Sequence, residues 1–294
     1  MSISPKRTRP AWQLPPGISR GTWDYLHTPS IADDYDRYFQ DHPLLKLDIE
    51  VVRRLLPKVP QEQFTIADFG CGTARVARAL IPLGHRVLNV DLSRHMLRQA
   101  SQQDATHEQL SSCVQANLVQ LDWLRDSILD MAVCLFSSIG MIRGREHRQK
   151  FLSHVCRSLR ADAPLILHVH NRLRSLLDPG GPAWLLKTWL SSWTNRDWEY
   201  GDRVYAYRGL PSMFLHIYSR RELVNDLKTA GFTKLQILPI NSTADDLLPP
   251  ATRFTNVRAG GYFVIARREC FSTIQFWGSF KSVAHIGLEW LVPL

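Results

Sequence analysis

The 294-residue chain has few cysteines and no long hydrophobic run. Its five cysteines lie far apart without a Cys-x-x-Cys pair, which argues against a disulfide framework and favours buried thiols in a reducing compartment. No stretch reaches the roughly 20 uninterrupted apolar residues of a membrane span. The basic N-terminus lacks the apolar core of a secretory signal. We therefore expect a cytoplasmic protein without a membrane span.

Acidic residues are also in short supply, with 27 against 36 lysines and arginines, so the net charge is +9. Such a balance permits an anionic partner such as RNA but does not require one. The basic residues are spread along the chain, and the densest groups (143–148 and 267–268) fall at the ends of expected elements. We interpret them as solvated faces. The histidines lack metal-ligand spacing, so we expect no metal.

The chain divides by composition into three parts. Residues 1–20 carry four prolines and predict a flexible N-terminal arm. Residues 21–270 predict a single domain, in which 21–60 supply an N-terminal lid and helix and 171–218 an aromatic-rich insertion on the substrate side. The apolar tail 271–294 is expected to pack on the domain as a helix, the alternative being contact with a partner or a membrane surface.

Strand-like and helix-like segments alternate through the domain. Expected helices are 73–82, 93–103 and 145–160, and Ser219 with Glu222 forms a capping box before another helix. Such alternation implies right-handed crossovers and a parallel sheet. We predict an α/β fold, a Rossmann-like three-layer sandwich whose mostly parallel seven-stranded sheet has its last strand antiparallel. The expected strands are 64–69, 86–91, 112–116, 129–136, 164–170, 233–239 and 261–267.

The most informative motif is a glycine bend after the first strand of this pattern. Gly70 and Gly72 follow an apolar run, and Asp91 ends the next strand about 20 residues later, as in a ribose-binding α/β unit. A dinucleotide fingerprint requires a third small residue, but Arg75 stands there and is too large for close packing of helix on strand. An acid, Asp68, stands two residues before the first glycine.

This combination of an acid, Gly-x-Gly and a distant second acid resembles the cofactor site of class I S-adenosylmethionine-dependent methyltransferases. Within that superfamily the chain resembles small-molecule enzymes of the UbiE and methyltransferase-11/25 types. It implies that Asp91 binds the ribose, that Leu92 lies on the adenine, and that Asn117, often Asp in the family, pairs with the adenine edge. The cofactor-binding residues implied are Asp68, Gly70, Cys71, Gly72, Asp91, Leu92, Asn117, Leu118 and Phe136.

Candidate residues on the acceptor side come from strand ends and from the N-terminal lid. His170 ends the fifth strand and is a candidate base or orienting group, because a histidine titrates near neutral pH. A purely structural histidine is the alternative. Aromatic faces attract a sulfonium as they attract an ammonium group, so lid tyrosines could close over the cofactor. Candidate lid and substrate residues are Tyr25, Tyr35, Tyr38, Ser137 and Asn171.

The leading hypothesis is a methyltransferase that transfers the cofactor methyl group to a small molecule by in-line displacement. Residues 183–215 would build the acceptor pocket. One alternative is a tRNA methyltransferase of the wobble-uridine type, because residues 203–232 are weakly similar to the end of those enzymes and the chain is basic. Others are a nicotinamide-dependent reductase, which Arg75 disfavours, and a non-catalytic cofactor-binding partner module.

Overall fold

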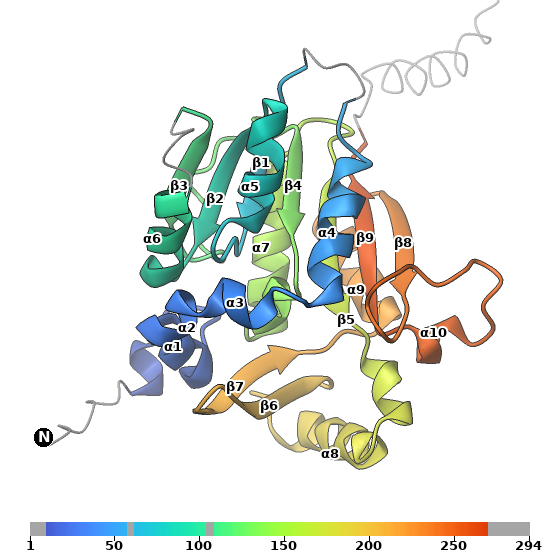
Figure 1. Ribbon diagram of the computed structural model, residues 1–294. Coiled ribbons are helices and arrows are strands. Elements are labelled where there is room, and N and C mark those ends of the chain that lie inside the picture. Colours follow the sequence, from blue (N-terminus) through green and yellow to red (C-terminus); the bar gives the residue numbers. More distant parts are fainter. Residues whose placement is uncertain (1–9, 58–61, 104–108, 270–294) are drawn as a thin grey trace, which may run out of the picture.

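The computed structural model describes residues 10–57, 62–103 and 109–269. Its centre is a seven-stranded sheet in the order β3-β2-β1-β4-β5-β9-β8 (Figure 1). The first five strands pair in parallel, whereas β9 runs antiparallel to both β5 and β8. This confirms the predicted Rossmann-like sheet with a reversed last strand. The strands are β1 (Thr65–Phe69), β2 (Arg86–Asp91), β3 (Ser111–Gln115), β4 (Met131–Cys134), β5 (Leu165–His170), β8 (Lys234–Ile240) and β9 (Gly261–Arg267).

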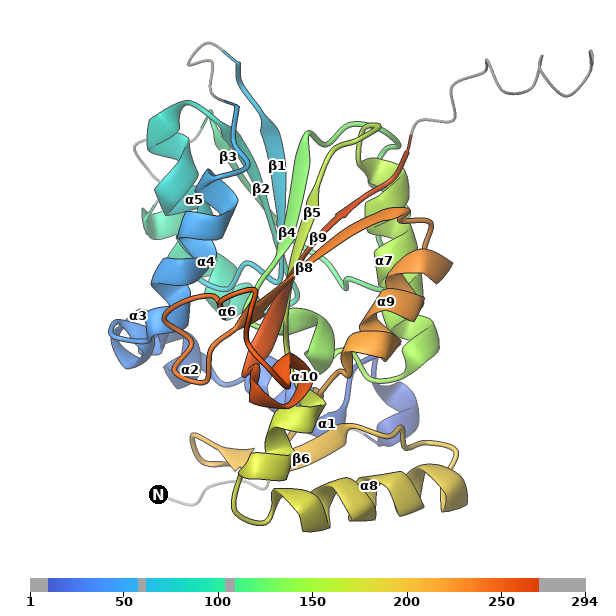
Figure 2. The ribbon, with the colours of Figure 1, turned by 90° about the vertical axis from the view of Figure 1, so that its right-hand side faces the viewer.

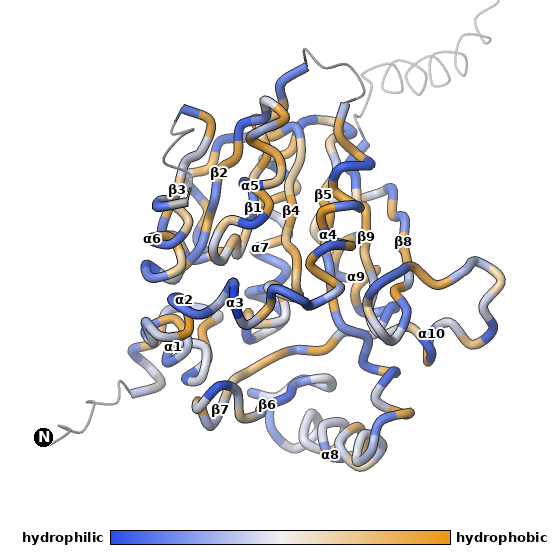
Figure 3. The backbone as a smooth tube through the Cα atoms, viewed as in Figure 1, coloured by the Kyte–Doolittle hydropathy of each residue, from blue (hydrophilic) through white to orange (hydrophobic). Residues whose placement is uncertain are grey.

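Helices cover both faces of the sheet and complete the three layers (Figure 2). One face carries α4 (Pro43–Arg53), α5 (Arg75–Leu80) and α6 (Arg94–Gln103), and the other carries α7 (Arg145–Ser158) and α9 (Arg220–Thr229). Strands covered on both sides must be apolar throughout, and every residue of β4 is buried. The inner strands accordingly form the hydrophobic centre of the molecule (Figure 3).

Two helix starts show why the sequence specifies these elements. Pro43 occupies the first turn of α4, where its fixed φ suits the helix and its missing N–H costs no hydrogen bond. The predicted capping box of α9 is confirmed. The backbone N–H of Glu222 donates to Ser219 Oγ at 3.3 Å, and the N–H of Ser219 donates to the Glu222 carboxylate at 3.5 Å.

Two expected elements are shorter than their apolar patterns suggested. The strand predicted over 129–136 ends at Cys134, because Phe136 and Ser137 adopt left-handed backbone conformations with φ of 52° and 62°. The helix predicted from residue 73 begins at Arg75, because Ala74 is also left-handed, with φ of 61°. Both turns lie at the carboxyl edge of the sheet, where open α/β sheets bind their ligands, so they form part of the surface that a ligand would contact.

The N-terminal segment packs against this same edge through short helices. Pro16 and Gly17, part of the expected flexible arm, are held in place: Asn117 Nδ2 donates to the Pro16 carbonyl at 2.9 Å, and the N–H of Arg143 donates to the Gly17 carbonyl at 2.8 Å. Residues 1–9 of that arm, and the tail 271–294, lie outside the described residues. The helical turns here are η1 (Ala11–Gln13), α1 (Arg20–Leu26), α2 (Pro29–Asp33) and α3 (Tyr35–Phe39).

The expected insertion follows β5 and forms a two-stranded hairpin with one helix. The hairpin lies beyond the carboxyl ends of the parallel strands, and α8 runs along its outer side (Figures 1 and 2). Its contact with α1 is tight, since a Cβ added at Gly21 would lie 1.7 Å from the Ser212 carbonyl oxygen. Arg208 also binds Asp34 at 2.9 Å. The elements are η5 (Arg172–Leu177), α8 (Gly181–Thr194), β6 (Asp202–Tyr207) and β7 (Leu210–His216).

Three short turns complete the secondary structure of the described ranges. They are η2 (Ile81–Leu83), η4 (Ser138–Met141) and α10 (Thr255–Arg258). None of the helices in the described ranges combines the length and the apolar character that crossing a membrane takes.

Candidate functional site

The bend between β1 and α5 depends on its two glycines for different reasons. The N–H of Gly70 donates to the Val90 carbonyl of β2 at 2.7 Å, and its φ of 75° is left-handed. A Cβ added there would lie 2.8 Å from Ser138 Cβ, so a side chain does not fit. Gly72 is also left-handed, with φ of 56°, but an added Cβ would meet only Tyr35 Cε1, at 3.9 Å. The backbone of Gly72 is therefore open to a ligand.

Asp91 faces this bend from the end of β2. Its Oδ2 accepts the N–H of Gly72 at 2.9 Å, and its Oδ1 accepts the N–H of Ser93 at 2.7 Å. Burial raises the pKa of Asp91, and the N–H groups of Ser93, Gly72 and Leu92 work in the opposite direction. Each carboxylate oxygen keeps a second lone pair, so the side chain can still accept hydrogen bonds from a ligand.

A cavity of about 330 Å³ extends from the bend along the carboxyl edge of the sheet. Most of the residues predicted for the site line it together: Gly70, Gly72, Asp91, Leu92, Asn117, Leu118, Phe136, Ser137, His170, Tyr25 and Tyr35. Asn117 lines the cavity, but its amide is already engaged, because Oδ1 accepts the N–H of Val119 at 3.0 Å while Nδ2 donates to Pro16. To pair with an adenine edge, Asn117 would have to use the second N–H of Nδ2 or the second lone pair of Oδ1.

Four predicted residues do not line the cavity. Cys71 of the bend and Asp68 of β1 are buried, and burial raises the pKa of Asp68 to about 7 against the opposing effect of Arg75. Tyr38 is 55% exposed and packs under the guanidinium of Arg208, 4.5 Å from its ring centre.

Asn171, the fourth of these residues, has a structural partner for each polar atom. Its Oδ1 accepts the N–H of Leu173 at the start of η5, and its Nδ2 donates to the carbonyls of Asn256 and Ala259, at 2.7 and 2.8 Å. Asn171 therefore ties η5 to α10, and a substrate contact is not needed to explain it.

No sequence motif predicted which residues form the far wall of the cavity, although residues 183–215 were expected to contribute to it. Tyr205 and Tyr207 of β6 and Met213 and Leu215 of β7 line it, at the period of two that brings side chains to one face of a hairpin. The α8 part of that range does not line it. From the N-terminal side come Ile18, Thr22, Leu26, Phe39 and His42, and the remaining lining residues are Met96, Ser138, Met141 and Ile142.

Two imidazoles face this aromatic part of the cavity. His170 ends β5, and burial, followed by the neighbouring His42, lowers its pKa to about 4. Burial also lowers the pKa of His42, whose Nδ1 is buried without a hydrogen-bond partner. Both rings are therefore neutral at neutral pH and can orient a ligand by a hydrogen bond. A group with so low a pKa is a weak base.

The titration of His170 should show this directly. We expect its ring resonances in NMR to stay constant from neutral pH to about 5 and to move around pH 4. Because the folded-state value lies below the ordinary 6.5, the unfolded chain binds the proton more readily. The contribution of His170 to stability is complete above pH 6.5 and is lost as the pH falls toward 4. The resonances of His170 are assigned by their absence from the spectrum of a His170→Gln variant. A titration midpoint near pH 6.5 would show that the ring is hydrated rather than enclosed.

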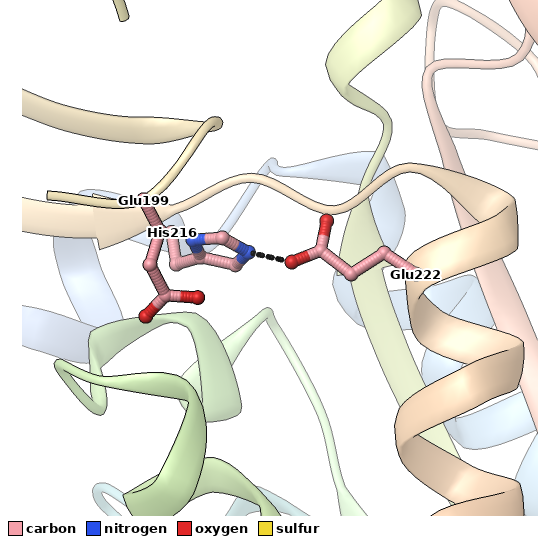
Figure 4. A group of neighbouring side chains, drawn as sticks. All are labelled: Glu199, His216 and Glu222. Carbon is pink, nitrogen blue, oxygen red and sulfur yellow. Dashed lines mark hydrogen bonds and ion pairs between the residues drawn. The ribbon is translucent and has the colours of Figure 1, made fainter. Parts of the chain in front are cut away.

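A second group of polar side chains lies between the hairpin and α9 (Figure 4). The potential ligand atoms of Glu199, His216 and Glu222 lie within 4.8 Å of one another, a spacing that could suit a metal ion. The two ring nitrogens of His216, however, already bind carboxylates, Asp202 at 2.7 Å and Glu222 at 2.9 Å. Burial opposes protonation of His216, but these two hydrogen bonds prevail and raise its pKa.

Arginines complete the charge balance of this cluster. The guanidinium of Arg148, which is fully buried, binds Glu199 at 2.7 Å, and that of Arg172 lies 3.2 Å from Glu222. Three carboxylates therefore face two guanidiniums and an imidazole with a raised pKa, and the charges balance without an ion. We interpret the cluster as the anchor that fixes the hairpin wall of the cavity to α7 and α9.

Comparison with known proteins agrees with this geometry. Residues 66–162 match the family model of a methyltransferase domain. The fold is similar to an S-adenosylmethionine-dependent methyltransferase from Methanosarcina mazei (20% identity, TM-score 0.54, covering 74% of this chain and 97% of that one). It is also similar to the CcbJ methyltransferase from Streptomyces caelestis (16% identity, TM-score 0.57, covering 82% of this chain and 96% of that one).

A third similar structure is the 1,6-didemethyltoxoflavin-N1-methyltransferase of Burkholderia thailandensis, with 1,6-didemethyltoxoflavin and S-adenosylhomocysteine bound. Its identity is 15% and its TM-score 0.54, and the match covers 84% of this chain and 87% of that one. No curated protein matches the chain in sequence. The matched segment contains the glycine bend and Asp91, the two features on which the site is built. The chain therefore contains a segment that matches a methyltransferase domain, and its fold is similar to that of S-adenosylmethionine-dependent methyltransferases.

Proposed function

We propose that this protein methylates a small, uncharged and planar acceptor held in the cavity between the glycine bend and the β6–β7 hairpin. The observation that carries the proposal is the continuity of this cavity. It runs from Gly72 and Asp91, which suit the cofactor, to an aromatic wall with two neutral imidazoles, which suits an acceptor. The Burkholderia structure, with substrate and S-adenosylhomocysteine bound together, supports placing both ligands side by side in this fold.

The residues around the bend fit S-adenosylmethionine part by part. The open backbone at Gly72 leaves room for the methionine portion, while the free lone pairs of Asp91 can accept the ribose hydroxyls. Leu92 and Leu118 offer apolar surfaces to the adenine. Asp68 is buried and does not line the cavity, so we assign it no contact with the cofactor. When bound, the cofactor supplies a methyl group on a positively charged sulfur, which a nucleophile can displace.

The acceptor side selects by shape and by the absence of charge. Apart from Asp91, no carboxylate, ammonium or guanidinium lines the cavity within the described ranges, so a charged acceptor would lose its hydration without a counter-ion. Flat aromatic faces from Tyr25, Phe39 and Tyr205 favour a planar molecule. His170 and His42 orient its polar edge. Holding the acceptor in line with the methyl group, in a cavity that excludes water, supplies the rate.

The same observations weigh against the other hypotheses. An RNA acceptor would need basic side chains for its phosphates, and the lining has none within the described ranges. A non-catalytic module with a blocked pocket is not supported either, because no side chain fills the space over Gly72. We propose the cytoplasm as the location, since a reducing compartment keeps the buried thiols of Cys134 and Cys156 free.

A transfer assay tests this function. Purified protein is incubated with methyl-labelled S-adenosylmethionine and a cell extract separated into small-molecule, RNA and protein fractions. We expect label in the small-molecule fraction only, and none with an Asp91→Ala variant. Label that enters RNA, with a rate that falls steeply as salt rises, would instead establish the tRNA hypothesis.

A further inference from the structure

The outer face of α8 exposes a stripe of large apolar side chains. Leu186, Trp189, Leu190 and Trp193 follow one another at i, i+3, i+4 and i+7, the spacing that places residues on one side of a helix. They are exposed by 57, 40, 50 and 75%. The exposed Leu176 and Leu177 of η5 belong to the same segment. Six of the thirteen exposed large hydrophobic residues in the described ranges thus fall between residues 176 and 193.

The opposite side of α8 is the one that packs on the protein. Leu185 and Thr188 are buried, and Thr188 Oγ1 lies 3.3 Å from the carbonyl oxygens of both Glu199 and Asp202. The stripe therefore points away from the hairpin and the sheet, at the end of the molecule where Figure 2 shows α8. Trp189 and Trp193 pack against each other, with ring centres 4.8 Å apart. The stripe is a formed surface on a helix that is itself well anchored.

Charge around the stripe has one predominant sign. The only charged residue of α8 is Lys187, and Arg196 is exposed just after the helix, whereas Arg203 packs over Trp184 on another side of α8. Among the acids, Asp197 is exposed, while Asp178 lies 3.8 Å from Arg174. Glu199 and Asp202 turn inward to Arg148 and His216. What faces solvent beside the stripe is therefore mainly positive, in a chain whose net charge is +9.

The size of the stripe argues against a second copy of the chain as its partner. The stripe runs from Leu186 to Trp193 and is about 12 Å long, so at a width of about 10 Å it covers roughly 120 Å². A stable dimer usually buries about 800 Å² on each partner. A lipid surface has no such requirement, because it accepts a narrow apolar stripe wherever tryptophans and leucines meet the headgroups and basic residues meet anionic lipid.

We propose that the outer face of α8 is a membrane-surface contact, which lays Leu186, Trp189, Leu190 and Trp193 into the headgroup region of an anionic bilayer. The helix lies in the plane of the interface, and the side chains of Lys187 and Arg196 face the lipid phosphates. This site is separate from the cavity and does not depend on the proposed methyl acceptor.

The test is sedimentation of the full chain with vesicles. We expect binding to vesicles of phosphatidylcholine mixed with phosphatidylglycerol, weaker binding to phosphatidylcholine alone, and a blue shift of tryptophan fluorescence with the mixed vesicles. The double variant Leu190→Gln/Trp193→Gln should lower the partition coefficient by about tenfold or more, because it removes two apolar side chains from the interface. Trp123→Gln, at a 46% exposed tryptophan elsewhere, should change nothing.

Calorimetric binding of S-adenosylmethionine checks that each variant is folded, and the single substitution Trp193→Gln serves if the double variant is not. Equal sedimentation of wild type and α8 variants would overturn the proposal, and so would equal binding to neutral and anionic vesicles. A concentration-dependent dimer in analytical ultracentrifugation that the α8 variant abolishes would also overturn it, in favour of a second copy.

Discussion

Asp91→Ala should weaken the binding of S-adenosylmethionine by about a hundredfold or more while the protein stays folded. Hydrogen bonds to a charged group contribute about 1.5–3 kcal/mol each, and we assign two of them to the ribose hydroxyls. The loss follows from the position of the carboxylate, which faces the cavity while two of its lone pairs are held by Gly72 and Ser93. Isothermal calorimetry gives the affinity, and far-UV circular dichroism reports the fold.

Asp91→Asn is the matched variant. It keeps the shape and one acceptor oxygen, so its affinity should fall between those of the wild type and the alanine variant. If both variants bind the cofactor as tightly as the wild type, Asp91 has no part in the site, and the assignment of the bend fails with it.

Arg148→Met should cost about 3–5 kcal/mol of unfolding free energy, the usual loss when one partner of a buried ion pair is removed. Arg148 is fully buried, and its guanidinium is the close cation of Glu199 and lies 3.9 Å from Glu222. Without it Glu199 lacks a counter-charge, whereas Glu222 keeps Arg172 and His216. Urea unfolding followed by circular dichroism measures the change.

The control for this variant is Arg54→Met, at the residue that follows α4. Arg54 pairs with Glu50 at the surface, where both side chains are more than half exposed, and such pairs contribute less than about 1 kcal/mol. A loss for Arg148→Met no larger than for Arg54→Met would show that the cluster does not hold the hairpin.

Much of the fold could be predicted because the central strands are short, continuously apolar segments separated by clear helix signals. The capping box at Ser219 and the proline at Pro43 set helix starts through local chemistry alone. The end of β4 could not be predicted in this way. Leu135 and Phe136 continue the apolar run after Cys134, and the left-handed turn falls on Phe136 and Ser137 rather than on a glycine.

The residues of the candidate site likewise divide into those that local sequence predicts and those that only the tertiary structure brings together. Gly70, Gly72 and Asp91 were predictable because each stands at a strand end, and a parallel sheet brings such ends to one edge. Tyr38 and Asn171 were placed at the site by residue type, but Arg208 and α10 bind them elsewhere. His42 and the hairpin side chains carry no local motif. Only the tertiary arrangement brings them to the cavity.

The hairpin forms a sheet of its own, and it supplies one wall of the cavity without sharing a strand with the sheet that carries the glycine bend. During evolution a duplicated copy of this gene could exchange or remodel that wall while the bend and Asp91 stay untouched. The acceptor can then change while the cofactor stays the same, so sequence divergence between paralogues should concentrate in β6 and β7.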